Sequence, residues 1–143
     1  MKFWDTSAVV PLCIQEAGTE TVRNILDEDP SLVVWWGTRT ECSSAFMRKV
    51  REGQLTPNDM RVARRALDAV VQAGIEIQPS EAVRGTAERL LGVHPLRAAD
   101  ALQLAAAIQW CQGLTAGNGL VVFDRRLREA GYAEGFTVFP DRL

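Results

Sequence analysis

The chain has 143 residues, a length typical of one domain with its own hydrophobic core. Its 16 basic and 18 acidic residues leave a net charge of −2, which argues against a protein that coats nucleic acid nonspecifically. No apolar run approaches the roughly 20 residues of a membrane helix. The charged start Met1–Asp5 is unlike a signal peptide, and the three cysteines form no CxxC pair. We therefore expect a cytoplasmic protein with reduced thiols.

The first half of the chain alternates apolar runs of strand length with helical patterns. The run Leu32–Trp36 is apolar throughout, as in a strand covered on both faces. Thr56 followed by Pro57 is a typical helix start, and Gly74 is placed to end that helix. The elements predicted here are a strand over 2–4, a helical stretch over about 7–29 interrupted near Gly18, a strand over 32–36, and helices over 38–53 and 56–73.

The second half continues the alternation. Its central element is the helix Arg97–Cys111, which is apolar nearly all round and should therefore be buried. The elements predicted around it are a strand over 75–77, a helix from 80 to 91, a loop over 92–96, a strand over 120–123, a helix over 125–130 and a strand over 136–139. Such alternation predicts one α/β domain over 1–143, with a mostly parallel central sheet of about four or five strands and helices on both faces.

Several kinds of chemistry are excluded by the residues that are present. His94 is the only histidine, it precedes Pro95 in a predicted surface loop, and no nucleophile-elbow motif occurs. The chain also has no GxxxxGK[ST] loop, and its glycines at 113, 117 and 119 precede a predicted strand instead of following one. Histidine-pair ribonuclease chemistry, a serine-histidine triad and the common nucleotide-binding loops are therefore not expected.

Carboxylates remain as the candidate reactive groups. Asp5 and Asp124 each follow a predicted strand, at the sheet edge where ligands bind in open parallel sheets, although each could equally cap the next helix. Asp100 is the only acid on an otherwise apolar helix, where a carboxylate is costly unless it is paired or bound to metal. It could also favour the helix dipole near Arg97. Glu41 lies early in the predicted helix over 38–53.

Together these four acids suggest a divalent metal site. Oxygen-rich clusters suit Mg²⁺ or Mn²⁺, which bind carboxylates and keep several waters. Such ions activate water and stabilise both the attacking and the leaving oxygen of a phosphodiester. This chemistry needs no histidine, which agrees with the composition of the chain.

Four short motifs, in this order, resemble those of PIN-domain ribonucleases, and in particular the VapC toxins of toxin–antitoxin operons. The resemblance extends over essentially the whole chain, and the motif around Asp100 is the most specific. The motifs are Asp5-Thr6-Ser7-Ala8, Glu41-Cys42-Ser43-Ser44-Ala45, Leu96-Arg97-Ala98-Ala99-Asp100-Ala101 with Leu104-Ala105-Ala106-Ala107, and Phe123-Asp124-Arg125-Arg126-Leu127.

The resemblance implies a metal-dependent endoribonuclease whose catalytic and metal-binding residues are Asp5, Glu41, Asp100 and Asp124. It also implies one or two Mg²⁺ or Mn²⁺ ions, a homodimer, and a small antitoxin protein that inserts a segment into the site. Ser7, with Thr6 beside it, occupies the place of a supporting hydroxyl. Many relatives carry Thr two residues before the last acid, whereas this chain has Val122.

Basic and aromatic residues offer possible contacts to RNA or to a partner. Arg97, Arg125, Arg126 and Arg128 flank Asp100 and Asp124 and could bind RNA phosphates, or the last three could form a solvated helix end. Among the four tryptophans, Trp36 ends a predicted strand; core packing is favoured for it over contact with a partner or a base.

Two alternative functions remain open. One is a PIN-like module that binds RNA or protein with little catalysis, which the intact set of four acids disfavours. The other is a phosphate-handling α/β protein that uses Asp5. Such proteins usually have a second acid directly beside the first and a late lysine, whereas here Thr6 follows Asp5 and the only lysines are Lys2 and Lys49.

Overall fold

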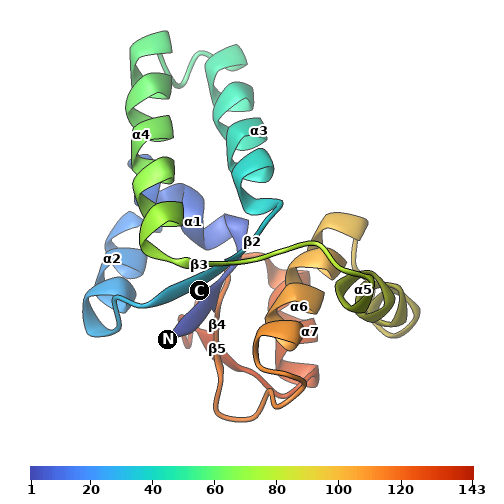
Figure 1. Cartoon of the computed structure of the whole chain (residues 1–143). Coiled ribbons are helices and arrows are strands. Elements are labelled where there is room, and N and C mark those ends of the chain that lie inside the picture. Colours follow the sequence, from blue (N-terminus) through green and yellow to red (C-terminus); the bar gives the residue numbers. More distant parts are fainter.

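Figure 1 shows the computed structural model of the chain, which describes all residues from Met1 to Leu143. Five strands form one sheet in the order β3-β2-β1-β4-β5, and every neighbouring pair is parallel. The strands are β1 (Lys2–Trp4), β2 (Leu32–Trp35), β3 (Ile75–Ile77), β4 (Gly119–Val121) and β5 (Thr137–Phe139). The predicted α/β fold with a parallel central sheet is therefore confirmed.

Seven helices cover the two faces of this sheet (Figure 1). They are α1 (Thr6–Cys13), α2 (Thr19–Glu28), α3 (Thr38–Arg51), α4 (Pro57–Ala73), α5 (Glu81–Val93), α6 (Ala98–Trp110) and α7 (Arg125–Ala133). Apolar side chains of α1 to α4 and of the strands form a core of 15 buried residues on one face. Apolar side chains of α5 to α7, together with strand residues and the segments beside the strands, form a core of 18 buried residues on the other face. Six of these 18 residues belong to α6, so α6 is central, as its composition predicts.

The strand order reverses at β1, which lies between β2 and β4. Trp4 pairs with Val121, so the residues that follow β1 and β4 emerge next to each other at the carboxyl edge of the sheet. Ligands of open parallel sheets bind at such a reversal point. This edge is where a functional site is expected.

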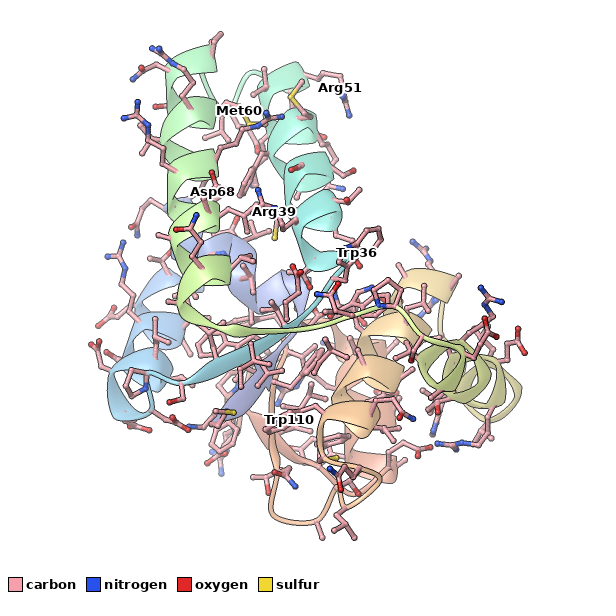
Figure 2. All side chains as sticks on the ribbon, viewed as in Figure 1. Trp36, Arg39, Arg51, Met60, Asp68 and Trp110 are labelled. Atoms are coloured by element: carbon pink, nitrogen blue, oxygen red, sulfur yellow. The ribbon has the colours of Figure 1, made fainter.

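Helices α3 and α4 form a hairpin that projects away from the sheet (Figure 1). Figure 2 shows Arg39 of α3 and Asp68 of α4 facing each other across it, and their side chains form an ion pair of 2.6 Å. At the tip, the Thr56 hydroxyl accepts from the backbone of Asp59 while the Asp59 carboxylate accepts from the backbone of Thr56. This reciprocal cap fixes the start of α4.

Two expectations about single side chains need correction. Trp36 is 52% exposed, because β2 ends at Trp35 and the chain turns into α3, so the favoured core packing of Trp36 is wrong. His94 is not a surface residue either: its ring is 11% exposed, and its Nε2 lies 2.7 Å from a carboxylate oxygen of Glu134. His94 joins the end of α5 to the end of α7 and lies apart from the acids.

The three cysteines are free, as expected. Cys13 and Cys42 are buried, and burial raises the pKa of both thiols. None of the helices combines the length and the apolar character that crossing a membrane requires.

Candidate active site

Asp5 lies at the carboxyl end of β1, where its backbone N–H donates to the carbonyl of Val121 on β4. Its side chain caps α1: Oδ2 accepts from the Ser7 backbone at 2.8 Å and from Ser7 Oγ at 2.5 Å. Asp5 is only 4% exposed. Burial is the main reason that its pKa rises to about 6; the bonds from Ser7 oppose this rise, and the charge of Asp100 adds to it.

Ser7 connects Asp5 to the segment that carries Asp124. While its hydroxyl donates to Asp5, Ser7 Oγ accepts from the backbone of Phe123 at 2.9 Å and of Asp124 at 3.3 Å. Val122 itself is fully buried in the core and offers no hydroxyl. Ser7 thus supplies, from α1, the contact that holds the start of the Asp124 segment.

Glu41 lies in the first turn of α3, and two side chains from other helices hold its carboxylate. Thr6 Oγ1 donates to Oε2 at 3.0 Å, and Gln103 Nε2 of α6 lies 3.2 Å from Oε1. Burial is the largest cause that raises the Glu41 pKa to about 7, followed by the charge of Asp5. The start of α3 requires glycine at position 37, because a Cβ there would collide with the ring of Trp35.

Asp100 and Asp124 complete the set. Asp100 lies in the first turn of α6, and its pKa is raised by partial burial and then by the charge of Asp124. The positive charges of Arg97 and Arg126 oppose this shift. Asp124 is exposed and caps α7, with Oδ1 accepting from the Leu127 backbone at 2.9 Å. Both aspartates that follow strands are therefore helix caps as well as members of the cluster.

One cavity of about 550 Å³ brings together all the acids predicted from the sequence, along with both hydroxyl residues that follow Asp5. It is lined by Asp5, Thr6, Ser7, Val10, Glu16, Glu41, Ser44, Ala45, Arg48, Lys49, Asp100 and Asp124. In this structure, no three His, Cys, Asp or Glu side chains lie close enough to one another to bind the same metal ion. Mg²⁺ commonly uses only one or two carboxylates and fills its other positions with water, so this oxygen-rich cavity fits such an ion.

The predicted RNA-binding arginines divide into two groups. Arg97, Arg125 and Arg126 line a second cavity, which shares Asp100 and Asp124 with the first. Arg128 does not belong there, and its predicted RNA contact is wrong. It is 7% exposed, and its guanidinium donates to the carbonyls of Val122 at 2.8 Å, Phe139 at 3.2 Å and Pro140 at 2.6 Å.

Gln103 is a member of the site that sequence reasoning missed. It is 1% exposed, and its Nε2 also lies 2.8 Å from Thr6 Oγ1 and 3.1 Å from Thr38 Oγ1. Its position three residues after Asp100 was a usable signal. On a helix this apolar, a buried amide needs polar partners, and residues three apart share a helix face.

Comparisons with known proteins give full-length relatives. The chain is 38% identical over 138 residues to Ribonuclease VapC47 of Mycobacterium tuberculosis, which covers 92% of this chain and 93% of that protein. It is 30% identical over 144 residues to Ribonuclease VapC45 of the same species, and the alignment covers 99% of this chain and 96% of that protein. No profile of a known protein family matches the chain.

Solved structures with the same fold are more distant in sequence. The crystal structure of Mycobacterium tuberculosis VapC20, described as a sarcin-ricin loop cleaving toxin, has a TM-score of 0.69 at 17% identity and covers 96% of this chain and 97% of its own. FitAcB from Neisseria gonorrhoeae has a TM-score of 0.66 at 15% identity, and the match covers 97% of this chain and 96% of that structure. These likenesses extend over nearly the whole α/β fold.

Proposed function

Because this chain belongs to the VapC family of ribonucleases, we propose that it is an Mg²⁺- or Mn²⁺-dependent endoribonuclease that hydrolyses RNA phosphodiester bonds. The observation that carries the proposal is the shared cavity of Asp5, Glu41, Asp100 and Asp124. Three of these carboxyls have a raised pKa, and in each case the charge of another acid in the set contributes. Such a site would gain stability from a bound cation.

The hydrolysis would depend on how this chain orients its oxygens. Bound in the cavity, a divalent ion would activate water and offset charge on the phosphodiester. Asp5 and Glu41 are the most constrained donors, since Ser7, Thr6 and Gln103 hold their carboxylates. Asp124 is exposed, whereas the Asp124 backbone is fixed by Ser7. We assign Asp5 and Glu41 to the floor of the site and Asp124 to its substrate side.

The proposed partners are RNA, a small antitoxin protein and a second copy of the chain. Solved structures with this fold include a toxin–antitoxin complex from Klebsiella pneumoniae, with a TM-score of 0.64. In this chain, we propose that an antitoxin segment covers the cavity and that Arg97, Arg125 and Arg126 bind RNA phosphates beside it. The cytoplasm is the proposed compartment, because RNA substrates and reduced thiols belong there.

The deciding experiment measures cleavage of labelled RNA with Mg²⁺, with Mn²⁺ and with chelator, in the parent, Asp5→Asn and Asp100→Asn. We expect cleavage only with metal, and a loss of orders of magnitude in both variants, since each removes a charge from the cavity. Cleavage that persists in chelator, or in both variants, would rule out the metal mechanism.

Thermal melts give a readout that does not depend on activity. In chelator, Asp100→Asn should be at least as stable as the parent, because it removes a charge that is disfavoured by partial burial and by repulsion from Asp124. In saturating Mn²⁺ the order should reverse, because the parent gains the larger binding free energy. If metal shifts neither melt, Asp100 is only an acid in the first turn of a helix.

A further inference from the structure

The acid-lined cavity does not end at the acids but continues along α3. Ser44, Ala45, Arg48 and Lys49 form this extension, with Glu16 on the facing segment. On a helix with 3.6 residues per turn, positions 41, 44, 45 and 48 share one face. Glu41 is thus the first residue of a mostly polar stripe along α3. Figure 1 shows that α3 is part of the projecting hairpin.

The two cations that line this extension of the cavity, Arg48 and Lys49, differ in their partners. Lys49 Nζ lies 3.3 Å from Glu16 Oε2 and 3.4 Å from Gln54 Oε1, so its charge is already balanced within the protein. Arg48 is exposed and has no ion-pair partner. Basic residues in a last helical turn favour the helix dipole, but that interaction does not require the side chain to line a cavity. Arg48 is therefore a free cation facing the site.

Cations also flank the acids on the other side. The second cavity shares Asp100 and Asp124 with the first and carries Arg97, Arg125 and Arg126. The cleavage position thus lies between a cation on α3 and three cations at the starts of α6 and α7. A long polyanion bound across the four acids could contact Arg48 on one side of them and the three arginines on the other side. A single small anion could not reach both sides.

We propose that Ser44 and Arg48 form a phosphate subsite for an RNA strand, distant from the bond that is cleaved; this rests on the proposed ribonuclease function. Seven residues of helix separate Arg48 from Glu41, which is about 10 Å at about 1.5 Å per residue. A stacked strand advances about 3.4 Å per nucleotide. Arg48 therefore contacts a phosphate about three nucleotides from the scissile one, and the hydroxyl of Ser44 lies between them along the strand.

The test compares Arg48→Ala with Arg64→Ala, which removes the same charge from an exposed position on α4 that lines neither cavity. Steady-state cleavage of unstructured RNA is measured with saturating metal, over a range of salt concentrations. Arg48→Ala should raise KM about tenfold and change kcat little, because it removes a charge-assisted contact away from the reacting atoms. The dependence of log KM on log salt should also become shallower by about 0.7, the value for one phosphate of a single strand.

Substrate length gives a second, sharper readout. Oligonucleotides that extend four or more nucleotides to both sides of the cleaved bond should show the Arg48→Ala defect. Those cut back to one nucleotide on each side should be cleaved equally by the parent, Arg48→Ala and Arg64→Ala. Arg48→Lys should recover part of the loss, because it keeps the charge but not the two-pronged geometry of guanidinium.

Three outcomes would overturn the subsite. If Arg48→Ala and Arg64→Ala shift KM equally, the effect is one of net charge alone. If the defect persists on the shortest substrates, Arg48 acts at the cleavage position. If RNA kinetics stay at the parent level and only the affinity of an antitoxin protein falls, the surface binds protein. Failure of the parent to cleave any RNA would instead reject the proposed function on which the subsite rests.

Discussion

Gln103 Nε2 lies 3.2 Å from Glu41 Oε1, although the two residues are 62 positions apart in the chain. Gln103 follows Asp100 on α6 by three residues, so the helix that carries one acid also orients another on α3. The same nitrogen contacts the hydroxyls of Thr6 and Thr38. One buried amide therefore connects α1, α3 and α6 beside the Glu41 carboxylate.

Gln103→Leu should weaken Mn²⁺ binding by about tenfold to a hundredfold, the usual effect of removing a group that orients a metal ligand. The free energy of unfolding should change by only about 1 kcal/mol. Leucine loses the hydrogen bonds of Gln103 Nε2, but it also removes Gln103 Oε1, which is buried without a partner. Titration calorimetry measures the binding, and urea denaturation in chelator measures the stability.

Gln109→Leu is the matched control. Gln109 lies on the same helix and donates to Thr86 Oγ1 at 3.1 Å, away from the acids. Gln109→Leu should leave the Mn²⁺ affinity at the parent value. Equal affinities in the two leucine variants would mean that Gln103 only fills space.

The metal-free protein should become more stable as the pH falls from about 7 toward about 4. Asp5 has a folded pKa of about 6 against an ordinary 3.8, so the folded state takes up a proton before the unfolded state does. Glu41 acts in the same direction between about 7 and 4.5. The cost of the Asp5 charge at neutral pH is about 3 kcal/mol, from about 1.4 kcal/mol per unit.

Asp5→Asn should remove the part of that dependence that comes from Asp5 and leave the part that burial of Glu41 causes. Its amide oxygen can still accept from Ser7, so in chelator it should be more stable than the parent at pH 7 and nearly equal to it near pH 4. Urea denaturation across this range measures the difference. A parent that loses stability steadily on acidification would show that the Asp5 carboxylate is stabilised in the fold, contrary to this prediction.

Arg128 should be a stability residue and not a substrate contact. Arg128→Met would leave three carbonyl oxygens without their charged donor, at a cost of about 3 kcal/mol. Arg125→Met removes the same charge from an exposed position on α7 and should change stability by less than about 0.5 kcal/mol. Denaturant unfolding of the two variants measures these losses of stability. Equally small losses in both variants would contradict the structural role of Arg128.

His94→Ala should leave RNA cleavage at the parent rate and lower stability by about 1 kcal/mol, as expected for the loss of one hydrogen bond. The substitution removes the hydrogen bond between His94 and Glu134.

The pKa of Glu134 is lowered, mainly by its hydrogen bond from Arg89. A carboxyl with a lowered pKa stabilises the fold at any pH above its ordinary pKa, and that contribution disappears as the pH falls through the lowered value. Glu134→Gln should therefore cost stability at pH 7 and little at pH 3, as measured by melts.

The sheet, the helices and the convergence of the acids could be predicted because each leaves a local pattern. Apolar runs of strand length mark β2 and β4, and the lone acid on an apolar helix marks Asp100. Arg128 and Arg126 could not be told apart, since both belong to one basic run on α7. Only the packed fold shows that Arg128 points toward the carbonyls near the end of β5 while Arg126 faces the cavity.

Trp36 and Gln103 illustrate the same limit in opposite directions. The run from Leu32 to Trp36 is apolar without a break, so nothing in it indicates that β2 ends one residue early and exposes Trp36. Gln103 is polar, yet it is buried because hydroxyls from two distant segments meet it. The sequence signals that Gln103 needs polar partners, because it follows Asp100 on an apolar helix, but it does not say which remote residues those partners are.

The hydrogen bond between Ser7 and the backbone of Asp124 joins residues 117 positions apart. During translation, β1 is made first but remains without its β4 neighbour until residues 119–121 have been synthesised. The acids therefore cannot assemble on a ribosome-bound fragment that stops before β4. A nascent ribonuclease with this topology would lack its full set of acids, and so could not cleave the message that encodes it, until β4 and Asp124 have been made.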